Sequence, residues 1–256
     1  MRERRFLILP GDIEEGRAFI RGDELHHLQR VLRLRSGDEV SVFDGRGRGF
    51  RGRIESIESA RAVVSLGERE DPRVEPRLKI TLMQSIPHGE RMDLIVEKAT
   101  ELGVVRIVPI VSERSVVRPK PGAWARLSRL RRIAVAAAKQ SGRLVVPEIA
   151  EPASFLDRLS PAGGSPADPD AARIIFHTSG GPAAAPRAIF DRRDIVSVQV
   201  LVGPEGGWTE GEFASATSAG WVAATLGPRI LRADTAAAAA LTLVLVGARE
   251  IAIPVR

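Results

Sequence analysis

Two glycine-bearing segments near the C-terminus most constrain the fold of this chain. They are GPEGG (203–207) and LGPRILR (226–232), and each follows an apolar run typical of a buried strand. Thr209 and Glu212 form a capping-box pattern, so a helix is predicted directly after the first segment. Glycine loops between strands and helices present backbone amides at the carboxyl edge of a parallel sheet, where small ligands bind. The pattern predicts an α/β fold with a ligand site made by these two loops.

Composition excludes several classes of site. The 256 residues include no cysteine, so disulfides, thiolate zinc sites and cysteine nucleophiles are ruled out. His26 and His27 are expected on different sides of a helix without a matching carboxylate pattern, and we predict no metal site. The N-terminus lacks the apolar stretch of a secretory signal, and the longest apolar segment, 236–248, is too short to span a bilayer. We expect a cytoplasmic protein without membrane contacts.

The sequence pattern changes near residue 75. A predicted helix at 23–33 and short strands at 39–43, 49–57 and 61–66 indicate a small β-rich domain, residues 1–74. After a charged connector with two prolines, predicted strands and helices alternate. The strands are 79–84, 104–111, 174–177, 195–202 and 222–226, and the helices include 91–102 and 124–141. This alternation predicts a second domain, residues 78–256, with a mostly parallel sheet flanked by helices.

Basic charge is concentrated in one stretch. From Arg114 to Arg143 there are nine basic side chains and no acidic one. Arginine suits phosphate groups and stacks on bases, so a nucleic-acid partner is one interpretation. A genome that favours arginine codons explains the same bias equally well.

The segment DGRGRG (44–49) resembles a dinucleotide-binding loop, but a strand rather than a helix is predicted to follow it. We therefore interpret it as the tip of a hairpin. Arg51 and Arg53 then lie on one face of the following strand, opposite Phe50 and Ile54, as an RNA contact would require.

Arg232 stands just before the last predicted helix, for which Asp234 or Thr235 is the expected cap. A positive charge there is unfavourable unless a partner compensates it. The alternatives are a functional role for Arg232 and a buried ion pair with Glu205 or Asp234. His177, at a strand end, is expected either to line the ligand pocket or to bond to backbone.

Several motifs occur together and in order: HHLQRVLR (26–33), FDG (43–45), EKATELG (97–103), QSGR (140–143), GPEGG (203–207) and LGPRILR (226–232). Together they resemble the bacterial 16S ribosomal RNA uridine N3-methyltransferases of the SPOUT superfamily (RsmE type), over almost the whole chain. Many members carry glutamate where Asp234 stands here.

The resemblance implies a PUA-like N-terminal β-barrel that binds RNA and a C-terminal α/β domain with a trefoil knot. It also implies S-adenosylmethionine as methyl donor, a homodimer, and 16S rRNA of the small ribosomal subunit as substrate. The cofactor-binding positions it implies are Phe176, His177, Thr178, Val202, Gly203, Glu205, Gly206, Gly207, Leu226, Gly227, Ile230 and Leu231.

Methylation of N3 of uridine requires loss of the N3 proton and stabilisation of the charge that spreads onto the carbonyl oxygens. We expect Arg232 to hold that charge, and Asp234 or Glu205 to accept the proton or orient Arg232. The arginines expected to bind RNA are Arg30, Arg33, Arg48, Arg51, Arg53, Arg114, Arg118, Arg132 and Arg143.

Two other functions compete with this one: a SPOUT methyltransferase acting on transfer RNA or a ribose 2′-hydroxyl, and a ribosome assembly factor without catalytic activity. A phosphohydrolase fits less well, because no lysine follows either glycine loop. The alanine run 236–240 predicts a helix that packs closely, either against a partner copy or within one chain.

Overall fold

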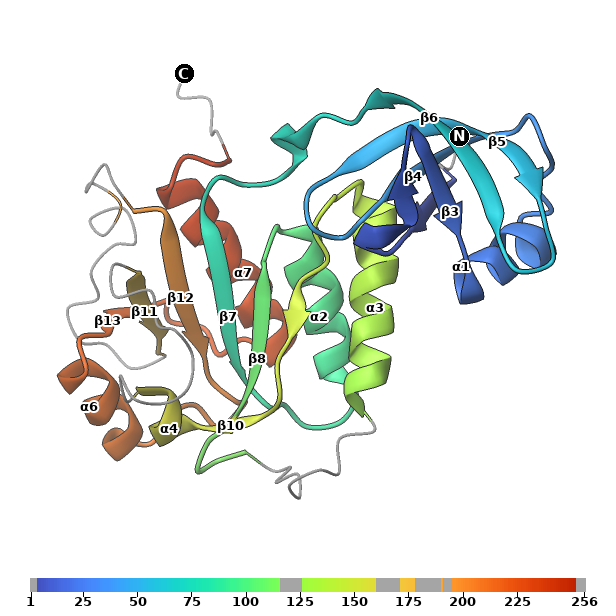
Figure 1. The fold of residues 1–256 in the computed structure, drawn as a ribbon. Helices are drawn as coiled ribbons and strands as arrows, with labels where there is room; N and C mark the ends of the chain where they lie inside the picture. The colour runs from blue at the N-terminus through green and yellow to red at the C-terminus, as the bar shows by residue number, and fades with distance from the viewer. Residues whose placement is uncertain (1–3, 116–125, 160–170, 178–189, 191–194, 252–256) are drawn as a thin grey trace. The chain divides into compact units, whose positions relative to one another are not determined.

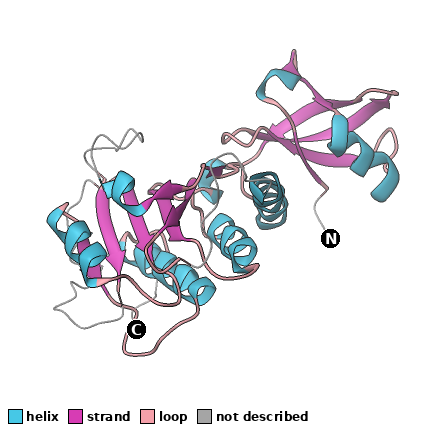
Figure 2. Ribbon diagram, turned by 90° about the horizontal axis from the view of Figure 1, so that it is seen from below, coloured by secondary structure: helices cyan, strands magenta, loops and turns pink. Residues whose placement is uncertain are grey.

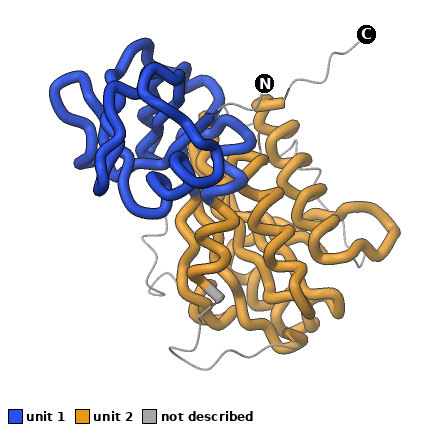
Figure 3. The backbone as a smooth tube through the Cα atoms, turned by 90° about the vertical axis from the view of Figure 1, so that its right-hand side faces the viewer, with its two compact units in different colours: residues 1–75, 135–146 blue, residues 76–134, 147–256 orange. Residues whose placement is uncertain are grey.

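The computed structural model describes residues 4–115, 126–159, 171–177, 190 and 195–251. The chain divides into two compact units (Figure 3). One comprises Met1–Glu75 and Val135–Val146, and the other comprises Pro76–Ala134 and Pro147–Arg256. From the sequence we had placed 135–146 in the second domain, whereas these residues belong to the first compact unit.

The first unit is built on a six-stranded sheet. In spatial order the strands are β1 (Arg5–Leu7), β4 (Glu39–Phe43), β5 (Gly49–Ile57), β6 (Ala62–Arg69), β3 (Arg17–Ile20) and β2 (Ile13–Glu14). β1 and β4 are parallel, and the remaining pairs are antiparallel. Residues 44–48 connect β4 to β5, which confirms the hairpin interpretation of this glycine-rich segment. The unit also contains two short 3-10 turns in its described residues, η1 (Pro10–Asp12) and η3 (Pro72–Val74).

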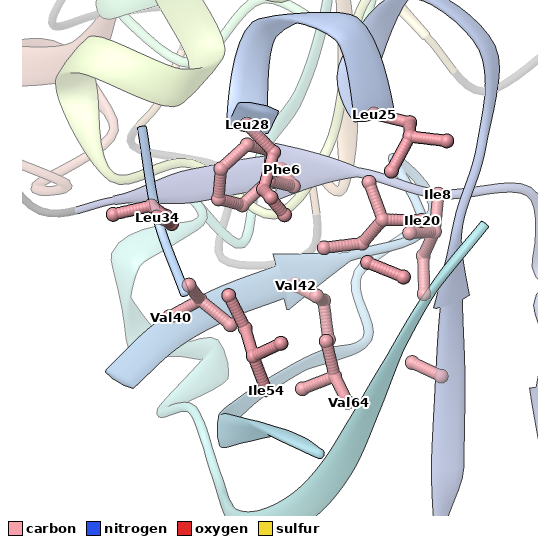
Figure 4. Packing of buried hydrophobic residues seen from close by; sticks show 12 residues of the cluster. Phe6, Ile8, Ile20, Leu25, Leu28, Leu34, Val40, Val42, Ile54 and Val64 are labelled. Carbon is pink, nitrogen blue, oxygen red and sulfur yellow. The ribbon is translucent and has the colours of Figure 1, made fainter. Parts of the chain in front are cut away.

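A short helix covers the apolar face of this sheet. α1 (Gly22–His26) continues into a π-helical turn, η2 (His27–Val31). Leu25 and Leu28 are buried and point toward Phe6 and the strand residues of the core (Figure 4). Leu32, which the spacing Leu25, Leu28, Leu32 of a regular helix would place on the same face, is 38% exposed. The wider π turn, closed by the Leu32 N–H bonding to the His27 carbonyl at 3.0 Å, shifts Leu32 away from that face.

The returning segment 135–146 completes the first unit. Ala138 and Leu144 are buried against Phe43 at the end of β4. The Lys139 ammonium bonds both carboxylate oxygens of Glu24, at 3.0 and 2.8 Å. Because apolar contacts and an ion pair both come from a distant part of the chain, residues 1–75 do not contain all of this unit.

The second unit contains a parallel sheet, as its strand and helix alternation predicts. The spatial order is β10 (Ala153–Ser154), β8 (Arg106–Val111), β7 (Lys79–Ser85), β12 (Ser197–Val202), β11 (Ala172–Phe176) and β13 (Val222–Ala224), with β9 (Glu148–Ile149) also paired to β8. All described pairs in this sheet are parallel.

Helices lie on both sides of this sheet (Figures 1 and 2). They are α2 (Arg91–Glu101), α3 (Arg126–Ser141, whose last part belongs to the first unit), α4 (Phe155–Leu159), α6 (Glu210–Ser218) and α7 (Ala233–Gly247). α4 and α6 pack on a cluster that includes Leu201 of β12, while α7 contacts both β12 and α2. The neighbouring Val200 and Val202 are also buried, as expected for a strand covered on both faces. No helix in the described part of the chain is long and apolar enough to cross a membrane.

Candidate active site

Three neighbouring strands bring the predicted ligand loops together. β11 pairs with β12 on one side and with β13 on the other, all in parallel, so their carboxyl ends meet at one edge of the sheet. The His177 N–H donates to the Ala224 carbonyl at 2.9 Å, and the Trp208 Nε1–H donates to the Phe176 carbonyl at 3.0 Å. These bonds connect the segments that follow the three strands.

A cavity of about 170 Å³ lies at this edge. It is lined by Phe176, His177, Val202, Gly203, Pro204, Glu205, Gly206, Gly207, Trp208, Leu226, Gly227, Arg229, Ile230, Leu231, Ala233 and Ala236. Eleven of the twelve cofactor positions expected from the sequence are in this lining, and Thr178 lies outside the described residues. Pro204 and Arg229 belong to the two predicted loops, whereas we had not expected Trp208, Ala233 or Ala236. The position of Trp208 directly after the paired glycines could have indicated that it lines the cavity.

The cavity wall combines apolar side chains with exposed backbone groups. Leu226, Ile230 and Leu231 supply apolar surface, whereas the glycine segments supply backbone amides and carbonyls without side chains in front of them. Gly207 and Gly227 have φ angles of 67° and 92°, in the left-handed region that favours glycine. The residues present therefore fit a small ligand that has both apolar and polar surface.

Glu205 is held by a residue of another element. Its carboxylate forms an ion pair with Arg91, the first residue of α2. Both side chains are about one-third exposed, at 37% for Arg91 and 32% for Glu205. No local sequence signal predicted this pair, because the two residues are 114 positions apart.

Arg232 and Asp234 flank Ala233, which lines the cavity. Arg232 is the N-cap residue of α7 and is exposed, and within the described residues it forms no ion pair. The alternative of a buried pair with Glu205 or Asp234 is therefore wrong. Neither Asp234 nor Thr235 is the cap, since the helix begins at Ala233 and Asp234 lies in its first turn. The Asp234 Oδ1 atom is buried and has no hydrogen-bond partner among the described residues.

Most arginines expected to bind RNA are exposed: Arg30, Arg33, Arg48, Arg51, Arg53 and Arg132. Arg51 and Arg53 line a groove of about 1050 Å³ on the sheet of the first unit, together with the acidic Asp38, Glu39 and Glu68. Arg53 pairs with Glu39 at 3.0 Å, and Arg48 pairs with Asp44 at 2.7 Å. This groove therefore has mixed charge rather than a purely basic surface.

Two of the remaining three arginines form hydrogen bonds within the chain. Arg143 is only 2% exposed and donates to Glu75 from Nε at 3.0 Å and from Nη2 at 2.7 Å, so it is not available to an RNA phosphate. Arg114 donates to the carbonyls of Gly206 and Trp208 in the cavity loop. Arg118 lies outside the described residues.

Comparisons with known proteins agree with this architecture. Residues 74–245 match the family model of an RNA methyltransferase domain, and residues 20–66 match that of an RNA methyltransferase PUA domain. The chain is 32% identical over 237 residues to the ribosomal RNA small subunit methyltransferase E of Synechocystis, covering 93% of this chain and 75% of that protein. It is also 32% identical over 237 residues to the Bacillus subtilis protein of the same name, covering 91% of each.

A solved structure of a relative is also similar to this chain over nearly its whole length. The ribosomal RNA small subunit methyltransferase E from Neisseria gonorrhoeae, bound to S-adenosyl methionine, is 35% identical to this chain. It superposes with a TM-score of 0.81 over 95% of this chain and 97% of that one. On the family model, the sequence identities and the shared fold, the chain belongs to the RNA methyltransferase family that includes the ribosomal RNA small subunit methyltransferases E.

Proposed function

We propose that this protein uses S-adenosylmethionine to methylate N3 of a specific uridine in 16S ribosomal RNA of the small ribosomal subunit. The observation that carries the proposal is the cavity where β11, β12 and β13 end, with Arg232 and Asp234 on either side of the lining residue Ala233. A relative with 35% identity and the same fold binds S-adenosyl methionine. The cavity lining fits the nucleoside part of that molecule.

The cofactor supplies an electrophilic methyl group on a sulfonium sulfur. Gly203, Gly206, Gly207 and Gly227 would hold it through backbone groups, and Leu226, Ile230 and Leu231 through apolar contact. The target base must be unpaired or flipped out, because N3 lies on its pairing edge.

Arg232 and Asp234 act on the uracil ring during the reaction. Asp234, with a buried carboxylate oxygen not bonded within the described residues, accepts the N3 proton. Arg232, exposed and without an ion pair in the described part of the chain, neutralises the negative charge that develops on the uracil oxygens. The exposed arginines of the first unit and Arg132 of α3 bind RNA phosphates.

The proposal also includes the oligomeric state of the protein, its cellular compartment and its chain topology. We propose a cytoplasmic homodimer in which α7, with its alanine-rich surface, contacts the partner copy, and a trefoil knot in the chain around the cavity. A single species of monomer mass in light scattering would contradict the dimer.

The test incubates the protein with S-adenosylmethionine and small ribosomal subunits from cells that lack this methylation. Reverse transcription across 16S rRNA then detects N3-methyluridine, which cannot pair and stops the polymerase. One new cofactor-dependent stop at a uridine is the expected result. Cofactor binding without any stop would instead indicate another RNA or another methylated atom, and no cofactor binding would indicate an assembly factor.

A further inference from the structure

The turn that follows β8 is bonded to the cavity loop at two places. The Arg114 Nη1 donates to the Gly206 carbonyl at 2.6 Å and to the Trp208 carbonyl at 3.4 Å. The backbone N–H of Glu113 donates to Glu212 Oε1 at 2.8 Å. Two consecutive residues therefore hold the second half of the loop and the start of the helix that follows it.

The bond from Glu113 reaches Glu212, whose side chain is already held in place. Glu212 is 3% exposed, and its Oε2 accepts from the Thr209 N–H at 3.0 Å in the capping box of α6. One carboxylate thus joins the turn after β8 to the first turn of α6. The start of α6 therefore fixes the position of the C-terminal end of the loop.

The loop itself has little intrinsic rigidity. Gly206 and Gly207 are adjacent, and glycine has more accessible backbone conformations than any other residue. Gly206 is exposed, so the core does not fix it either. Within the loop, the Gly207 N–H donates to the Pro204 carbonyl at 2.9 Å. The carbonyls of Gly206 and Trp208 are held from outside the loop, by Arg114.

Arg114 projects from a turn that is itself firmly held. Ser85, Ser112 and Ser115 are buried and mutually hydrogen-bonded, with the Ser85 Oγ at 2.6 Å from the Ser112 Oγ and at 3.0 Å from the Ser115 Oγ. The Ser112 N–H also donates to the Ser115 Oγ at 3.0 Å. This cluster fixes the turn between two strand ends, so the backbone of Arg114 is well anchored.

We infer that Arg114 is a positioning residue for the methyl-donor site rather than an RNA ligand. It holds the carbonyls of Gly206 and Trp208 so that the loop is already in its binding conformation before the cofactor arrives. Preorganisation of this kind lowers the ordering cost of binding and therefore raises affinity. The inference rests on the proposed function, since it assumes that the cavity binds S-adenosylmethionine.

The test measures S-adenosylmethionine binding to the full-length protein by calorimetry. We expect Arg114→Ala to weaken binding about tenfold, the size of the loss of one charged hydrogen bond. At saturating cofactor the turnover rate should stay within about threefold of wild type, because a positioning effect on binding is removed by saturation. Arg131→Ala is the matched control, since this exposed arginine of the same basic stretch lies on α3 away from the cavity lining.

Two further results separate positioning from general loss of structure. Added guanidinium ion should restore part of the cofactor affinity of Arg114→Ala but not change that of the control. The cofactor affinity of Arg114→Lys should fall between those of wild type and Arg114→Ala, because an ammonium group cannot reproduce the geometry of the planar guanidinium. Unchanged affinity in both Arg114 variants would overturn the inference.

A role of Arg114 in binding RNA would give a different result in a salt titration of RNA binding. If Arg114 bound a phosphate, Arg114→Ala would lower the slope of log affinity against log salt by about one and leave cofactor affinity unchanged. We expect the slope to be unchanged. Failure of the wild-type protein to bind S-adenosylmethionine would reject the proposed function itself, whereas equal binding by wild type and Arg114→Ala would reject only the role of Arg114.

Discussion

Arg91, at the start of α2, forms an ion pair with Glu205, in the loop after β12. The pair engages the Oε1 atom of the Glu205 carboxylate. Asp234, in contrast, has a buried oxygen atom that is not bonded within the described residues. We propose that Asp234 accepts the N3 proton and that Glu205, which lines the cavity, fixes the loop.

The first prediction compares these two carboxylates. We expect Asp234→Asn to lower kcat about 100-fold or more, because the amide cannot accept the N3 proton. Glu205→Gln should lower kcat less than tenfold and should mainly weaken cofactor binding. Single-turnover rates at saturating S-adenosylmethionine distinguish the two, and the reverse order of effects would assign the proton to Glu205.

The second prediction concerns Arg232. Replacement by alanine should lower kcat about 100-fold, since a preorganised charge at the developing oxyanion is lost. The same change should raise the free energy of unfolding by about 0.5 kcal/mol, because a cation is unfavourable at the N-terminus of α7. Activity and thermal unfolding are measured on the same preparation. An active Arg232→Ala enzyme with normal cofactor affinity would contradict the assigned role.

The third prediction concerns the buried arginine of the first unit. Arg143→Met should lower the free energy of unfolding by about 3–5 kcal/mol, because it leaves the largely buried Glu75 carboxylate without its cation. The double variant with Glu75→Gln should recover much of that loss. Urea unfolding measures both, and a stable Arg143→Met protein with weakened RNA binding would instead support our original expectation for this residue.

The fourth prediction concerns pH. Burial of the Asp44 carboxyl raises its pKa, but hydrogen bonds from the Arg48 side chain and from the N–H groups of Arg46 and Arg48 outweigh burial and hold the pKa below its usual value. A carboxyl with a lowered pKa contributes stability above its unfolded pKa of about 3.9, and the contribution is lost as the pH falls through the folded pKa. Wild type should therefore melt above Asp44→Asn at pH 6. The difference should shrink below about pH 4, and a constant difference would contradict this account.

Local signals predicted the regular elements well. The spacing of Met92, Ile95, Val96, Ala99 and Leu102 predicted α2. The first four side chains are buried, whereas Leu102, the C-cap residue, is partly buried. Thr209 and Glu212 predicted the start of α6, where both bonds of the capping box are present. Such features depend on neighbours in the sequence, and so the sequence contains them directly.

The differences arise where distant segments meet. The burial of Arg143 depends on Glu75, and the role of Arg114 depends on carbonyls of Gly206 and Trp208. An arginine in a basic stretch has the same local sequence whether it faces solvent or a buried carboxylate. The π turn that turns Leu32 outward likewise follows from packing on the sheet, since leucine spacing alone predicts a regular helix.

The first unit takes its final segment, 135–146, from a later part of the chain. During translation the β-strands of residues 1–75 leave the ribosome well before Leu144 and Arg143, which pack and bond against them. The N-terminal unit therefore cannot reach its complete form while it is the only part synthesised. The first unit can complete its folding only after residue 146 has been synthesised, so its folding is coupled to synthesis of the strands and helices between residues 75 and 135.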